Sequence, residues 1–295
     1  MSKIAFYSSD SGNHRFIQPI IDRLIEKGYE CQLYNNWHID EQADILWFDF
    51  CDQNLITASK ENFELLKSKK TIARLHAVEY YMNFHHAIDW ACVSDLIFVS
   101  EHMKRLCGEL PVRTHVIHNG IDLDKFTYHE KPMSHQGFTL GYAGNIVPAK
   151  GILTMFHYFR ELCRHGDYKL KMVGLNRFSA RDLEFYKHYT QDLNIEEADE
   201  IGDINTWLDG IDYLWQPSNA ESFSMIVGEA MAKGIKPLVN DFYGARELWP
   251  ESCVYNDFTS FYGNLISGYY SAKYREFVEK YSLDNEMEKI CSLLI

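Results

Sequence analysis

Residues 213–240, which read YLWQPSNAESFSMIVGEAMAKGIKPLVN, decide the fold class. An apolar run at Tyr213–Gln216 is followed by a polar loop, by an apolar helical stretch at Met225–Lys233 and by a second apolar run at Lys236–Asn240. Two short buried strands joined by a helix form the β-α-β unit of a parallel sheet. The order strand, loop, helix, strand therefore predicts an α/β fold.

The same alternation continues along the rest of the chain. We expect further buried strands at Lys3–Ser8, Cys31–Tyr34, Asp44–Phe50, Thr71–His76, Asp95–Ser100, Thr114–His118, Phe138–Tyr142 and Tyr168–Val173. A polar stretch at Thr127–Gln136 lacks apolar periodicity and contains a proline, which is typical of a linker. We predict two Rossmann-like, doubly wound parallel-sheet domains at 1–126 and 137–268, a linker at 127–136 and a helical segment at 269–295.

Composition narrows the classes of function. The 295 residues carry 29 basic and 42 acidic side chains, a net charge of −13, so no stable nucleic-acid partner and at most peripheral membrane contact are expected. The seven cysteines form no C-x-x-C pair and are expected to be reduced. The first residues resemble no signal peptide, and no uncharged run is long enough to span a bilayer. We expect a cytoplasmic protein that acts on small molecules.

The loop at 142–151, YAGNIVPAKG, follows one predicted strand and opens a helix. Glycines allow a ligand to approach the backbone, and Lys150 stands near the helix start, so the loop suits a phosphate group. An ordinary connection whose glycines only form the turn explains the same residues equally well. Neither a P-loop nor a G-x-G-x-x-G motif occurs, which disfavours ATPases and dehydrogenases.

Two glutamates mark the loop and helix after Gln216. Glu221 follows the strand end, and Glu229 lies about two turns into the next helix among apolar residues. A carboxylate on an apolar helix needs a partner, and a vicinal diol such as that of a ribose donates two hydrogen bonds to one. A glutamate favoured only by the helix dipole is the alternative. For Glu229 we favour ligand binding.

The glutamate pair, its continuation at 230–234 (AMAKG) and the segment 244–247 (GARE) resemble the nucleotide-sugar site of family 4 glycosyltransferases. Residues 117–126, IHNGIDLDKF, are similar to that family's interdomain segment. The similarity is close from Val116 to Trp249 and extends to the N-terminal half only in pattern. It implies a GT-B fold with a cleft between two Rossmann-like domains, of which 1–126 would bind the acceptor and 137–268 the nucleotide sugar. It also implies that the helical segment 269–295 returns to the N-terminal domain. It also implies a retaining transfer of a hexosyl or pentosyl group from a nucleoside-diphosphate sugar to a saccharide or glycolipid acceptor, without cofactor or metal.

The resemblance assigns roles to individual positions. Lys150 would hold the donor diphosphate, Glu229 would accept hydrogen bonds from the ribose and Glu221 would contact the donor sugar. The candidate catalytic residues are Glu221, His76 and Lys150. The candidate donor-binding residues are Gly144, Asn145, Lys150, Gly174, Ser222, Phe223, Ser224, Met225 and Glu229.

Two positions depart from the family pattern. Asn145 stands where members commonly carry an arginine of the phosphate loop, so that either another cation, such as Arg177 or Lys104, replaces it or transfer is weakened. Ser222 and Ser224 stand where glycines are frequent, and their amides still donate hydrogen bonds.

In the N-terminal half, His76 ends a predicted strand at a position where family members place a histidine near the donor sugar. It would stabilise developing charge or bind the acceptor, or else it satisfies a strand-end carbonyl.

By resemblance, Gly12, Asn13 and Arg15 would contact phosphate or acceptor. The rings of Tyr80, Tyr81 and Phe84 are candidates for an acceptor groove, and the acidic pairs at 49–52 and 122–124 are expected to cap turns or face solvent.

Three other functions compete with this interpretation. A nucleotide-sugar epimerase or phosphorylase has the same fold, and an epimerase needs no acceptor. A catalytically weak nucleotide-sugar binding module is indicated only by Asn145. A transferase acting on a nucleic-acid base is disfavoured by the net charge.

Overall fold

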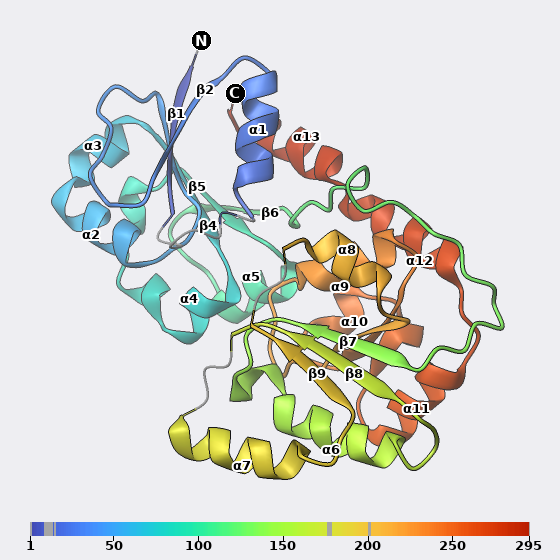
Figure 1. The fold of residues 1–295 in the computed structure, drawn as a ribbon. Helices are drawn as coiled ribbons and strands as arrows, with labels where there is room; N and C mark the ends of the chain where they lie inside the picture. Colours follow the sequence, from blue (N-terminus) through green and yellow to red (C-terminus); the bar gives the residue numbers. More distant parts are fainter. Residues whose placement is uncertain (1, 9–13, 15, 176–178, 200–201, 295) are drawn as a thin grey trace. The chain divides into compact units, whose positions relative to one another are not determined.

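The computed structural model describes residues 2–8, 14, 16–175, 179–199 and 202–294. The chain forms two compact units (Figure 1). Unit 1 comprises Met1–Gly120 and Leu283–Ile295, and unit 2 comprises Ile121–Ser282. No helix in the described part of the chain is both long and apolar enough to cross a membrane.

Unit 1 is built on a parallel six-stranded sheet with the order β2-β1-β3-β4-β5-β6. The strands are β1 Lys3–Tyr7, β2 Glu30–Tyr34, β3 Ile45–Phe48, β4 Lys70–Leu75, β5 Asp95–Phe98 and β6 Arg113–Val116. The helices are α1 Gln18–Glu26, α2 Gln53–Glu61, α3 Phe63–Ser68, α4 Ala77–Tyr81, α5 Glu101–Cys107 and α13 Leu283–Leu294. All six strands predicted in this half are confirmed, with ends that differ by one or two residues.

Helices cover both faces of this sheet, which explains why its inner strands are apolar runs. Because successive side chains of a strand point to opposite faces, Ile4 and Phe6 of β1 face one core, and Ala5 and Tyr7 face the other. The first core includes α1 and α13, which contact each other. The second core is closed by α2, α3 and α5.

Unit 2 contains a second parallel six-stranded sheet, with the order β12-β11-β10-β7-β8-β9. Its strands are β7 Thr139–Ala143, β8 Lys169–Val173, β9 Ile195–Ala198, β10 Tyr213–Gln216, β11 Lys236–Asn240 and β12 Val254–Tyr255. Its helices are α6 Ile152–Leu162, α7 Ala180–Thr190, α8 Ile204–Asp209, α9 Met225–Ala232, α10 Ala245–Leu248, α11 Phe258–Ile266 and α12 Ser271–Val278. The edge strands β9 and β12 were not predicted, because β9 is mostly exposed and acidic and β12 has only two residues.

Each sheet contains a point at which the strand order reverses. In unit 1 the reversal lies between β1 and β3, and in unit 2 it lies between β7 and β10. Parallel sheets of this kind bind ligands at the reversal, outside the carboxyl ends of the strands. The predicted doubly wound class is confirmed, and in unit 2 the topology directs attention to the loops after β7 and β10.

The stretch 127–136, predicted as a linker, is part of unit 2. Ser271 at the start of α12 fastens it: its Oγ lies 3.2 Å from Tyr128 Oη and accepts a 3.0 Å hydrogen bond from the Lys131 amide. The chain instead leaves unit 1 after Gly120 and returns after Ser282, so that α13 alone of the segment 269–295 belongs to unit 1.

The packing of α13 gives a first prediction. Ile290 is buried against α1 and the sheet, so Ile290→Ala should lower the free energy of unfolding of unit 1 by about 3 kcal/mol through lost contacts and a cavity. Lys289→Ala, at the exposed neighbouring position, should change it by less than about 0.5 kcal/mol. Urea denaturation followed by circular dichroism measures both, and equal effects would show that α13 is not packed in this way.

Candidate functional site

The loops after β7 and β10 are neighbours in unit 2 because these two strands pair with each other. A hydrogen bond of 3.1 Å from the Asn219 amide to the Ala149 carbonyl joins the two loops. The residues singled out in the sequence at 144–151 and 217–225 therefore lie at one edge of the sheet, at the reversal of strand order.

Two glycines allow the backbones at this edge to approach closely. Gly151, with φ of +68°, begins α6, and a Cβ at this position would lie 2.0 Å from the Pro217 carbonyl oxygen. Gly174 follows β8 with φ of +141°, and a Cβ there would lie 1.9 Å from the Gly144 carbonyl oxygen. Any other residue at these positions would force the loops apart.

This approach brings Lys150 and Glu221 together. Lys150 Nζ lies 2.6 Å from Glu221 Oε1, which also accepts a 2.9 Å hydrogen bond from Gln216 Nε2. Gln216 ends β10 and is buried, and its Nε2 also donates to Ser224 Oγ at 2.5 Å. Sequence reasoning missed Gln216, although a polar residue at the end of an otherwise apolar strand was a usable signal.

Ser224 has an unusual backbone conformation. Its φ of +73° and ψ of +79° are left-handed, a conformation that glycine adopts without strain and serine does not. The predicted departure from glycine at this position therefore falls on a residue for which glycine would be favoured. The Ser224 hydroxyl holds Gln216 instead of capping the helix that follows.

Helices α6 and α9 both begin at this edge. Within the described part of the chain, no side chain caps the start of either helix, and neither first turn contains an acidic residue. Backbone N–H groups in a first turn have no intrahelical acceptor and carry a partial positive charge. Together with Lys150, the two helix starts suit an anion such as a phosphate group.

Glu229 lies inside α9, where every residue from Ile226 to Ala232 is buried, and it is only 3% exposed itself. Its location on an apolar helix, as read from the sequence, is confirmed. A carboxylate this deeply buried requires hydrogen-bond donors around it.

The other predicted donor residues occupy varied positions. Phe223 is buried, with its ring 5.3 Å from that of Trp249 and 5.0 Å from that of Tyr281, and therefore forms part of the core beneath the loop. Ser222 and Met225 are half-buried. Asn145 is exposed, and its carbonyl accepts a 2.7 Å hydrogen bond from Tyr142 Oη.

Several predicted residues lie in unit 1 or outside the described residues. Lys104 is part of α5 in unit 1, where it lies in the last turn. Gly12, Asn13, Arg15 and Arg177 lie outside the described residues. No group of three or more His, Cys, Asp or Glu side chains able to hold a metal ion occurs among residues that the structure describes.

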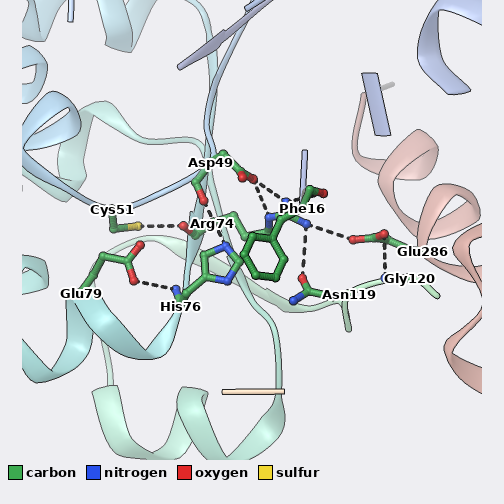
Figure 2. A network of polar contacts seen from close by, with 9 residues as sticks. All are labelled: Phe16, Asp49, Cys51, Arg74, His76, Glu79, Asn119, Gly120 and Glu286. Carbon is green, nitrogen blue, oxygen red and sulfur yellow. Dashed lines mark hydrogen bonds and ion pairs between the residues drawn. The ribbon is translucent and has the colours of Figure 1, made fainter. Parts of the chain in front are cut away.

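His76 lies in unit 1, between β4 and α4 (Figure 2). Its Nε2 is 3.2 Å from the Asp49 carbonyl oxygen, and because a carbonyl only accepts, Nε2 carries the proton. The ring packs against Phe16 and Phe50, and burial, aided by the charge of Arg74, holds its pKa well below the usual range. Here His76 satisfies a strand-end carbonyl as a neutral ring, the second of the two roles considered from the sequence.

Asp52 and Asp122 fit the expectation that the acidic pairs cap turns, but for Asp49 it is wrong, because this carboxylate is buried and pairs with Arg74. Asp52 Oδ1 accepts from the Asn54 amide at the start of α2, and Asp122 Oδ1 accepts from the amides of Asp124 and Lys125. Of the three candidate acceptor rings, only Tyr81 is exposed, whereas Tyr80 and Phe84 pack against the core of unit 1.

Comparison with known proteins places this arrangement in context. Residues 124–252 match the family described as glycosyl transferases group 1. Over 173 residues the chain is 25% identical to the capsular polysaccharide biosynthesis glycosyltransferase CapM of Staphylococcus aureus, a match that covers 52% of this chain and 45% of CapM. The chain thus spans about half the length of this curated relative.

Solved structures match the whole chain. Anabaena HepE, in complex with UDP and glucose, has a TM-score of 0.76 at 15% identity, with 100% of this chain and 99% of HepE covered. Sucrose-phosphate synthase from Thermosynechococcus elongatus has a TM-score of 0.77 at 13% identity, with 100% and 98% covered. The fold is GT-B, and the resemblance to GT-B glycosyltransferases inferred from the sequence is confirmed. Family 4 in particular stays a prediction.

The strained loop supplies a second prediction. Ser224→Ala and Ser224→Gly both remove the hydroxyl that binds Gln216, but only alanine keeps a Cβ in the left-handed conformation. The glycine variant should therefore be more stable than the alanine variant by about 1 kcal/mol in urea denaturation. Equal stabilities, or a more stable alanine variant, would contradict the conformation of Ser224.

Proposed function

We propose that this GT-B chain, similar to group 1 glycosyl transferases over residues 124–252, is a retaining glycosyltransferase of family 4. It would move a hexosyl or pentosyl group from a nucleoside-diphosphate sugar to a saccharide or glycolipid acceptor. The observation that carries the proposal is the convergence of Lys150, Glu221 and the uncapped starts of α6 and α9 at the reversal of strand order in unit 2.

The donor diphosphate would bind at the two helix starts. Its negative charge competes with Glu221 for Lys150 Nζ, since this ion pair is partly exposed, with 30% of the lysine side chain accessible. Once Lys150 turns to the phosphate, Glu221 stays oriented by Gln216 and can accept hydrogen bonds from hydroxyls of the sugar. In the bound state, hydroxyl groups of the sugar would thus take the place of Lys150 as the partner of Glu221.

Glu229 would accept from the ribose hydroxyls. A charged carboxylate forms shorter and stronger hydrogen bonds than a neutral acceptor, and its burial in α9 removes competing water. Binding of the nucleoside by Glu229 and of the diphosphate by the loop would orient the sugar–phosphate bond.

Departure of the diphosphate is the step that this edge would assist. Charge that develops on the leaving oxygen is stabilised by Lys150 and by main-chain N–H groups fixed before the reaction. Because Asn145 replaces the usual arginine, Lys150 is the only side-chain cation that the described part of loop 144–151 supplies. Transfer would retain the anomeric configuration by attack on the face from which the diphosphate leaves, with no metal and no covalent carboxylate.

The comparisons support the class of substrates. CapM is named a capsular polysaccharide biosynthesis glycosyltransferase, and HepE has been solved with UDP and glucose. A uridine nucleotide is therefore the first donor to test and a saccharide the first acceptor. Asn145 supports a second candidate function, a nucleotide-sugar binding module with weak catalysis, which would bind nucleotide without turnover.

Nucleotide binding tests the donor site directly. Lys150→Ala should weaken UDP binding about 10- to 100-fold, the effect of losing one charge-assisted contact, and Glu229→Ala should abolish it. Lys187→Ala and Glu184→Gln, at exposed positions of α7, are matched controls that should bind as the wild type does. Isothermal titration measures the affinities, and wild-type affinity of the Glu229 variant would remove the assignment.

The chemistry is tested by product analysis. With a donor identified by titration, NMR should show a product that has the anomeric configuration of the donor. The rate of transfer should be the same with and without EDTA. Turnover of the donor without acceptor would favour an epimerase, and an inverted product would exclude the retaining mechanism. Binding without any turnover would favour the binding module.

A further inference from the structure

Arg74 of unit 1 is a charged side chain with almost no access to solvent, since only 1% of it is exposed (Figure 2). Its guanidinium contacts four separate segments. It donates to Asp49 Oδ1 after β3 at 2.6–2.7 Å and to the Phe16 carbonyl before α1 at 3.1 Å. It also donates to Asn119 Oδ1 after β6 at 3.4 Å and to Glu286 Oε1 of α13 at 3.0 Å. One side chain thus joins three connections at the carboxyl edge of this sheet to the last helix.

Glu286 ties the same helix to the point where the chain leaves unit 1. Its Oε2 accepts a 2.8 Å hydrogen bond from the Gly120 amide, and a Cβ at Gly120 would lie 2.6 Å from this oxygen. The chain crosses to unit 2 directly after Gly120 and returns three residues before Glu286. A single carboxyl group therefore fastens α13 both to the exit of the chain and to Arg74.

Among the residues that the structure describes, two buried charged side chains face Glu286. They are Arg74 on β4 and Asp49 after β3, whereas Arg23 of α1 lies 3.6 Å from Asp284 instead. Burial raises the pKa of Glu286 to about 7, with Asp49 adding to the shift and Arg74 opposing it. Burial therefore favours the neutral form of this carboxyl over its charged form.

The cluster also reaches His76. Asp49 binds Arg74 through its carboxylate and His76 Nε2 through its carbonyl. We propose that Glu286 is a positioning residue whose proton-bearing carboxyl docks α13 and, through Arg74, fixes the backbone at Phe16, Asp49 and Asn119 in unit 1. The role in transfer rests on the proposed function, in which unit 1 would bind the acceptor, whereas the docking of α13 does not depend on it.

Hydrogen exchange of α13 tests the docking without any substrate. A carboxyl whose pKa is raised in the folded state stabilises that state below its ordinary pKa, and this stabilisation is lost as pH rises through the folded value. After correction for intrinsic rates, local opening of α13 in the wild type should increase roughly tenfold per pH unit from about pH 5 to 6.5 and level off above about pH 7.5. A flat wild-type profile overturns the proposal whether or not any variant folds.

Two variants separate Glu286 from other titrating groups. In Glu286→Gln, which cannot ionise, opening of α13 should be independent of pH over this range. Glu288→Gln, at an exposed position of the same helix, should keep the wild-type profile. A Glu286 variant that keeps the wild-type slope, or a Glu288 variant that loses it, overturns the assignment.

Kinetics then test the positioning role. In the wild type and in Glu288→Gln, the acceptor KM should rise several-fold between pH 6 and pH 8 relative to Glu286→Gln, while UDP affinity differs less than twofold among the three proteins. If the acceptor KM has the same pH profile in all three proteins, Glu286 does not position the part of unit 1 that Arg74 contacts, and the proposed positioning role is overturned. Absence of transfer in the wild type counts against the proposed function alone, because the exchange profiles are measured without it.

Discussion

The pairing of β7 with β10 is the contact on which the candidate site depends. It places the reversal of strand order in unit 2, so that the loops after both strands leave the same edge of the sheet. Gly151 then lets the start of α6 approach the Pro217 carbonyl to a distance that no side chain permits. As a result Lys150 and Glu221, which are 71 residues apart in sequence, form an ion pair. Without this strand order, Lys150 and Glu221 would not lie close enough to form the pair.

The two units use charge in different ways. The Lys150–Glu221 pair lies on loops and is partly accessible, so that a ligand can compete for either partner at small desolvation cost. Arg74 and Asp49 form a buried ion pair, and buried charges are stable only while each has its partners. The first arrangement suits exchange of one partner for a ligand. The second suits the fixing of a backbone, because loss of any partner leaves an uncompensated charge.

Sequence patterns predicted the features that depend on residues close together in the chain. Apolar runs gave the buried strands, and the loop at 142–151 and the glutamate pair were found from their places after strands. Strand β9 was missed because Glu196 and Glu197 at an exposed edge break the apolar run. Arg74 was missed because one polar residue inside a buried strand forms no pattern, and its partner Glu286 lies 212 residues away.

The two departures from the family pattern have opposite local consequences. Ser224 keeps a left-handed backbone and offers a hydroxyl to Gln216, which in turn holds Glu221, so the strain accompanies a fixed carboxylate. Asn145 supplies no charge, and its carbonyl is held by the Tyr142 hydroxyl. Loop 144–151 therefore contains one cation, Lys150, and a main chain that the Tyr142 hydroxyl binds. Under the proposed function, main-chain N–H groups at the starts of α6 and α9 would then supply most of the stabilisation of a bound diphosphate, beside Lys150.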